Sequence, residues 1–123
     1  MNIGLAQLNP TVGDLAGNAR KIIDACRALE NQGASIILTP ELVLTGYPPQ
    51  DLLFKSDFVP ASLRQLEEIH AEVGSAAWIV GCVQPNSSPN GRPFFNAAAI
   101  LEKGRPPRDR KSTRLNSSHL VIS

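Results

Sequence analysis

One carboxylate stands where α/β enzymes often place their chemistry, at the exit of an apolar strand. Residues 34–38 form a short, β-branched run that predicts a buried strand, and Pro40 cannot continue its hydrogen-bond ladder. The next residue, Glu41, is therefore held at a strand end. Its apolar neighbours should strip part of its hydration, which suits a carboxylate to proton transfer near neutral pH; they are Leu38, Leu42, Val43 and Leu44.

The same residues also allow a structural role for Glu41. A glutamate at a strand end can pair with a basic side chain or cap a turn, and structural ion pairs are commoner than catalytic carboxylates. On physical grounds alone, both roles stay open.

The residues around Glu41 carry a family resemblance. Pro-Glu-Leu at 40–42 and Leu-Thr-Gly-Tyr-Pro-Pro-Gln-Asp-Leu-Leu at 44–53 resemble the nitrilase (carbon–nitrogen hydrolase) superfamily. Within it, residues 3–18 (IGLAQLNPTVGDLAGN) and residues 46–51 (GYPPQD) look like the glutaminase domains of glutamine-dependent NAD+ synthetases. The resemblance runs from residue 1 to about residue 103.

This resemblance implies the fold class α+β, as the N-terminal part of a nitrilase-type αββα sandwich. In that fold two sheets pack face to face between outer helix layers, and the present chain would supply only the first part. We therefore expect residues 1–108 to form a partial carbon–nitrogen hydrolase (glutaminase) domain.

The resemblance also implies a reaction and roles for two residues. Such enzymes use a Glu, a Lys and a Cys to hydrolyse the side-chain amide of glutamine through a γ-glutamyl thioester, and the released ammonia amidates nicotinic acid adenine dinucleotide in a C-terminal ATP-dependent domain. Glu41 matches the general base, which takes the proton of the cysteine thiol. Tyr47 matches a tyrosine that lies against the glutamine pocket, although packing on Pro48 and Pro49 explains it equally well.

The nucleophile and the lysine of the family are not matched in the same way. Cys82 lies in the middle of a predicted strand, so we interpret it as a buried structural thiol. Lys111 falls near the expected lysine, but the residues after it depart from the family pattern. The chain as written should therefore be inactive.

The C-terminal residues have a different origin in our interpretation. Residues 109–119 (DRKSTRLNSSH) agree residue for residue with a translated sequencing adapter, so we expect residues 109–123 to be an artefactual disordered tail. Residues 105–123 hold five basic side chains and one acidic one, which leaves residues 1–104 with a net charge of −3, although the whole chain carries +1. The basic end is thus no argument for nucleic-acid binding.

Periodicity predicts alternating strands and helices, typical of a sheet covered by helices. Strands are expected at residues 2–8, 35–38, 78–83 and 96–101, helices at 17–31 and 61–73, and a turn-rich loop at 86–93. Cys26 and the helix residue His70 are expected to pack in or beside the core rather than to react.

Composition and motifs limit the partners that we expect. No apolar run is long enough for a membrane span, and no secretory leader precedes the chain, so we expect a cytoplasmic protein without membrane contact. No metal-ligand spacing or phosphate loop occurs, so we expect no cofactor in this domain. The resemblance implies that ATP and Mg²⁺ are used by the missing synthetase domain. The resemblance implies glutamine as substrate and a homo-oligomeric full enzyme. Another nitrilase-type amidase and a non-catalytic half-fold binding module remain the alternatives.

Overall fold

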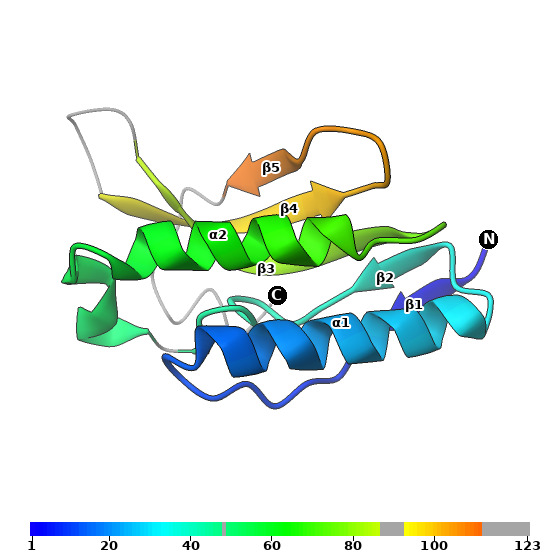
Figure 1. Ribbon diagram of the computed structural model, residues 1–123, viewed down its shortest axis with the longest axis horizontal. Helices are drawn as coiled ribbons and strands as arrows, with labels where there is room; N and C mark the ends of the chain where they lie inside the picture. Colours follow the sequence, from blue (N-terminus) through cyan, green and yellow to red (C-terminus); the bar gives the residue numbers. More distant parts are fainter. Residues whose placement is uncertain (48, 87–92, 112–123) are drawn as a thin grey trace.

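A mixed five-stranded sheet with two helices on it forms the frame of the computed structural model, which describes residues 1–47, 49–86 and 93–111 (Figure 1). The strands are ordered β1-β2-β3-β4-β5 across the sheet. In chain order the elements are β1 (Ile3–Leu5), α1 (Leu15–Asn31), β2 (Ile36–Leu38), the 3-10 helix η1 (Gln50–Phe54), α2 (Phe58–Ala71), β3 (Ala77–Pro85), β4 (Phe94–Leu101) and β5 (Arg108–Lys111).

Both long helices cover the same face of the sheet. Strands β1, β2 and β3 are parallel, so each pair is joined by a crossover, and α1 and α2 are those crossovers. Because such crossovers are right-handed and the strand order advances in one direction, the two helices must lie on one side. Figure 1 shows them side by side in front of the sheet. β4 and β5 then extend the sheet as antiparallel strands.

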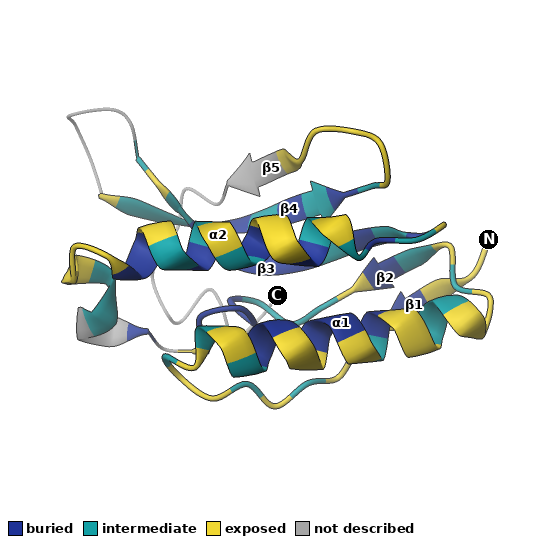
Figure 2. Cartoon of the chain, viewed as in Figure 1, coloured by how far each residue is buried: buried dark blue, intermediate teal, exposed yellow. Residues whose placement is uncertain are grey.

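The core lies between the helices and this face of the sheet (Figure 2). Ile37, Trp78 and Leu101 are fully buried and lie in register on β2, β3 and β4. From the helices, Ile22 and Ile69 pack into the same cluster. Asp14 caps α1 by accepting a hydrogen bond from the backbone of Gly17, and the left-handed Gly33 (φ +95°) follows its end.

The opposite face of the sheet carries an apolar row that no helix in the described part of the chain covers. Leu5, Leu38, Ile79 and Ile100 lie in register across β1 to β4, and side chains alternate along strands, so all four lie opposite the core residues just named. Leu5 is 64% exposed and Leu38 37%. A row of this kind is the surface on which a second sheet would pack.

The predicted elements are confirmed, with shifted ends, and two further elements are present. β1 is shorter than expected, α2 begins at Phe58, and η1 was not predicted because its five residues are too few to show a helical period. β5 was not predicted either, and the domain boundary expected at residue 108 falls at its first residue. The central residues of the expected loop, 87–92, lie outside the described residues. None of the described helices has the length and apolar character needed to cross a membrane.

Candidate active site

The turn that carries Glu41 is bonded to the backbone of β3. Thr39 donates from its amide and from its hydroxyl to the carbonyl oxygen of Ile79, at 3.0 and 2.9 Å. The amide of Gly81 donates to the same hydroxyl at 3.1 Å, and the amide of Leu44 donates to the carbonyl of Gly81 at 3.2 Å. The strand exit is therefore a fixed part of the sheet.

A close backbone approach explains why position 81 is a glycine. A Cβ atom at Gly81 would lie 2.4 Å from the carbonyl oxygen of Pro40, 2.6 Å from the amide nitrogen of Leu42 and 3.0 Å from the carbonyl carbon of Glu41. These distances are well inside the contact of about 3.5–4.0 Å that carbon atoms prefer. The turn can rest on β3 only because no side chain stands there.

The turn also contains the one backbone outlier among the described non-glycine residues. Leu42 has φ +51°, in the left-handed region that side chains other than those of Asn and Asp seldom adopt. Its side chain is buried against Phe58, Val59 and Val83. The packing of Leu42 thus holds a strained turn in place next to Glu41, and strain of this kind often occurs at functional sites.

The side chain of Glu41 reaches across β3 to β4. It is half-buried, and its Oε1 accepts a hydrogen bond of 2.6 Å from the side-chain amide of Asn96. Asn96 alternates with Ala97, which belongs to the core under the helices, so Glu41 and Asn96 lie on the helix-free face.

A second set of contacts fixes the far end of the turn. Asn18 on α1 is buried, with 1% of its surface exposed; its side-chain amide donates to the carbonyls of Thr11 and Leu44, and its oxygen accepts from the amide of Thr11. Gly46 (φ +81°) packs so closely on the backbone of Val12 that a Cβ would lie 2.6 Å away. The loop before α1 therefore packs against the far end of the Glu41 turn and supports it.

Tyr47 follows this turn and is 38% exposed. It follows directly after Gly46, the last residue of the supported segment. Pro48, on which the alternative explanation partly depends, lies outside the described residues.

The two cysteines are not placed to react with Glu41. Cys82 is 1% exposed and belongs to the core cluster under the helices, so it lies on the opposite face of β3 from the turn on Gly81. Its interpretation as a buried thiol is confirmed. Cys26 is fully buried, and burial, with a smaller contribution from the negative charge of Glu30, raises the pKa of its thiol to about 12.

Lys111 is the last residue of β5, in register with Ala97 and thus one position from Asn96 along the neighbouring strand. His70 packs beside the core as expected, where a ring nitrogen lies 2.8 Å from the carbonyl oxygen of Glu102.

Sequence reasoning identified Glu41 but missed the residues that hold it. These four residues come from four separate parts of the chain: Asn18 from α1, Thr39 from the exit of β2, Gly81 from β3 and Asn96 from β4. Three of the hydrogen bonds that involve their side chains join residues 26 to 55 positions apart. One signal was available, since Asn96 is the single polar residue in the apolar strand FFNAAAIL.

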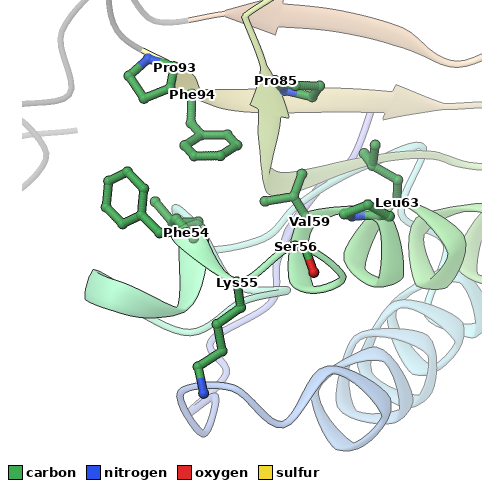
Figure 3. Close-up of a pocket in the computed structure, with 10 residues that line it drawn as sticks. Phe54, Lys55, Ser56, Val59, Leu63, Pro85, Pro93 and Phe94 are labelled. Carbon is green, nitrogen blue, oxygen red and sulfur yellow. The ribbon is translucent and has the colours of Figure 1, made fainter.

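An apolar hollow of about 410 Å³ lies elsewhere, between η1, the start of α2 and the ends of β3 and β4 (Figure 3). Phe54 and Phe94 meet edge to face there, with ring centroids 6.1 Å apart, and Phe54 is 72% exposed. Figure 3 shows Lys55 pointing away from the two rings. Glu41 does not line this hollow, so the carboxylate and the hollow are separate features.

Comparison with known proteins decides the family. Residues 2–120 match the carbon-nitrogen hydrolase family. The chain belongs to this family. It is 40% identical over 107 residues to the glutamine-dependent NAD(+) synthetase of Synechocystis sp. and 34% identical over 106 residues to that of Thermotoga maritima. These matches cover 84% and 85% of this carbon–nitrogen hydrolase chain, but only 19% and 18% of the two relatives. The chain thus spans about a fifth of the length of the curated relatives it matches.

Solved structures agree with this assignment. The glutamine-dependent NAD+ synthetase of Acinetobacter baumannii, in complex with ADP, matches with a TM-score of 0.77 at 25% identity, over 93% of this chain and 21% of that one. An amidase from Nesterenkonia sp. matches with a TM-score of 0.69 at 25% identity, over 94% of this chain and 44% of that one. The predicted fold, the first part of a nitrilase-type αββα sandwich, is confirmed, and the chain supplies one helix layer and one sheet.

Proposed function

We propose that this chain is the first part of the glutamine amidohydrolase domain of a glutamine-dependent NAD+ synthetase, with Glu41 as its general base. The observation that carries the proposal is the fixed carboxylate of Glu41, held at the exit of β2 by the turn on Gly81 and by the hydrogen bond from Asn96. The curated relatives support glutamine as the substrate, since both of those compared above are named as glutamine-dependent NAD(+) synthetases.

In the proposed reaction Glu41 takes the proton from a cysteine thiol supplied by the rest of the domain. The thiolate attacks the carbonyl carbon of the glutamine side-chain amide, and a lysine stabilises the oxyanion that forms. Collapse of this intermediate breaks the carbon–nitrogen bond, and Glu41 returns its proton to the leaving ammonia. Water then hydrolyses the γ-glutamyl thioester to glutamate and restores the thiol. Tyr47 is proposed to contact the glutamine substrate.

The remaining parts of the enzyme are assigned to the missing sequence. Within the described ranges, no three His, Cys, Asp or Glu side chains gather as they would around a metal ion. As the likeness to the synthetases suggests, we propose that ATP and Mg²⁺ act in the C-terminal synthetase domain, which would use the ammonia to amidate nicotinic acid adenine dinucleotide. We also propose a homo-oligomeric, cytoplasmic full enzyme that binds no nucleic acid and no membrane.

We keep the interpretation of residues 109–123 as translated adapter sequence, so that the native domain segment is 1–108. The family match extends to residue 120, and the structure pairs residues 108–111 with β4. The DNA sequence of the gene therefore has to distinguish adapter codons from native codons after residue 108. Sequencing the gene across codon 108 without a ligated adapter tests it. A frame that continues into a lysine and a later cysteine supports the proposal, and genomic codons for all of residues 109–123 contradict it.

A chimera tests the proposed reaction. In it, residues 1–108 replace the matching segment of the Synechocystis enzyme, which supplies the rest of the domain and the synthetase. We expect ammonia release from glutamine, abolished by Glu41→Gln, which keeps the shape of the side chain but cannot accept the thiol proton. Glu67→Gln, on the exposed side of α2, is the matched control and should leave ammonia release unchanged. Hydrolysis of small aliphatic amides but not of glutamine would favour the second candidate, a simpler amidase, which the Nesterenkonia likeness supports. An active Glu41→Gln variant would refute the role of Glu41.

A further inference from the structure

Asn96 is the one polar side chain in an otherwise apolar strand. It is 5% exposed, in the middle of the FFNAAAIL sequence of β4. Asn is depleted in strands, and a buried amide that lacks a hydrogen-bond partner costs about 1–3 kcal/mol. The partner that Asn96 finds therefore indicates why an amide stands at this position.

That partner is the carboxylate of Glu41, 55 residues earlier in the chain. The amide nitrogen of Asn96 lies 2.6 Å from Oε1 of Glu41. Because the amide group donates and a carboxylate accepts, the bond is charge-assisted, which makes it shorter and roughly twice as strong as a bond between neutral groups. The amide does not titrate near neutral pH, so it can orient Glu41 but cannot exchange protons with it.

The register of the two strands makes room for this bond. Val83 pairs with Asn96, and the next pair on the same face is Gly81 with Ala98. One of these two residues has no side chain and the other has only a methyl group. The turn lies over Gly81, and the side chain of Glu41 can therefore cross the sheet and meet Asn96 at the neighbouring position.

We propose that Asn96 is a positioning residue for the general base: its amide fixes the rotation of the Glu41 carboxylate in the orientation needed to take the proton from the nucleophile. This inference rests on the proposed function. The turn on β3 fixes the backbone of Glu41. The hydrogen bond from Asn96 on β4 adds a second restraint, because it fixes the end of the Glu41 side chain.

The test uses the chimera with substitutions at position 96. Asn96→Ala removes the donor, and kcat for glutamine should fall by up to about 10²-fold, the typical effect of misplacing a catalytic group by about 1 Å. KM should stay within about threefold, since substrate contacts are not removed. Asn96→Asp keeps the shape but places a second carboxyl beside Glu41. Its rate relative to the parent should recover as the pH falls, because one of two adjacent carboxyls then takes up a proton and can donate.

Ile100→Val is the matched control, on the same strand and the same face, four residues from Asn96. It should lower the thermal midpoint slightly and leave kcat unchanged. A purely structural Asn96 would lower the thermal midpoint without changing kcat per folded molecule and without a new pH dependence, and this result would overturn the proposal. If Asn96→Ala does not fold, the pH dependence of Asn96→Asp decides alone.

The two proposals fail in different ways. A chimera in which Glu41→Gln is inactive and Asn96→Ala is fully active keeps the proposed function and refutes the positioning role. A chimera in which Glu41→Gln is fully active refutes the general base, and the positioning role with it.

Discussion

Replacing Gly81 by alanine puts two physical effects in opposition. Glycine inside a strand is less stable than alanine by about 0.5–1 kcal/mol, so local preference alone predicts that Gly81→Ala stabilises the protein. Packing predicts the reverse, because the new methyl group would lie 2.4 Å from the carbonyl oxygen of Pro40 and 2.6 Å from the amide of Leu42. Both atoms belong to the backbone of the Glu41 turn and cannot rotate away.

The size of the effect follows from these distances. Restoring a contact of about 3.5 Å requires the turn to move by about 1 Å. Such overpacking costs about 1–3 kcal/mol, which exceeds the gain in strand preference. A shift of about 1 Å in a catalytic group can reduce the rate about 10²-fold. The bonds from Thr39 and Leu44 to β3 would be strained by the same movement.

The assay compares kcat and the thermal midpoint in the chimera. We expect Gly81→Ala to lose about 10²-fold in kcat and to unfold at a lower temperature. Gly104→Ala is the control: nothing lies within 4 Å of its new Cβ, but its φ of +78° makes alanine strained by about 1–2 kcal/mol. It should lose stability and keep kcat. A Gly81→Ala enzyme that is more stable than its parent and fully active would refute the close approach of the turn to β3.

Two further predictions concern the supports of the site. Asn18→Ala leaves the amide of Thr11 and the carbonyls of Thr11 and Leu44 without their buried partner, so the free energy of unfolding measured with denaturant should fall by about 2–4 kcal/mol. Asn18→Asp should not restore this free energy, because its carboxylate would face two carbonyl oxygens. Full recovery in Asn18→Asp would contradict this reasoning. For Cys26, whose pKa in the folded chain is raised by burial from its usual 9.0 to about 12, the unfolded chain loses the thiol proton first as the pH rises. Stability should therefore fall above pH 9, by up to about 1.4 kcal/mol per pH unit until the folded thiol also ionises, and Cys26→Ala should remove this slope; an unchanged slope would assign it to other groups.

The sequence was sufficient for features that depend on neighbouring residues. The buried face of α1 follows from residues three and four positions apart, and Ile22, Ile23 and Cys26 are indeed buried. Gly33, with φ +95°, follows the helix end, and a glycine directly after a predicted helix is a common sign of such an end. Glu41 could be located because a proline ends the preceding strand. Each of these inferences needs only a short window of sequence.

The sequence was insufficient for the long-range contacts of the Glu41 turn. The bond from Asn96 and the close approach to Gly81 depend on how β3 and β4 pair, which no local pattern determines. A glycine in a predicted strand can indicate close backbone approach, but it does not say which segment approaches. β5 was missed for another reason, because the interpretation of its residues as adapter sequence removed them from the fold prediction.

Glu41 lies on the face of the sheet that a second sheet would cover. Glu41 and Asn96 share the helix-free face with the exposed row that includes Leu5 and Leu38, whereas Cys82 lies under the helices. In an αββα sandwich the helix-free face is the one that meets the second sheet, so under the proposed function the residues that complete the site approach from that side. The nucleophile whose proton Glu41 would take is therefore expected from the sequence that covers this row. Covering the row would both bury the apolar side chains and exclude water from the carboxylate. Folding of the complete domain and assembly of its active site would then be the same event.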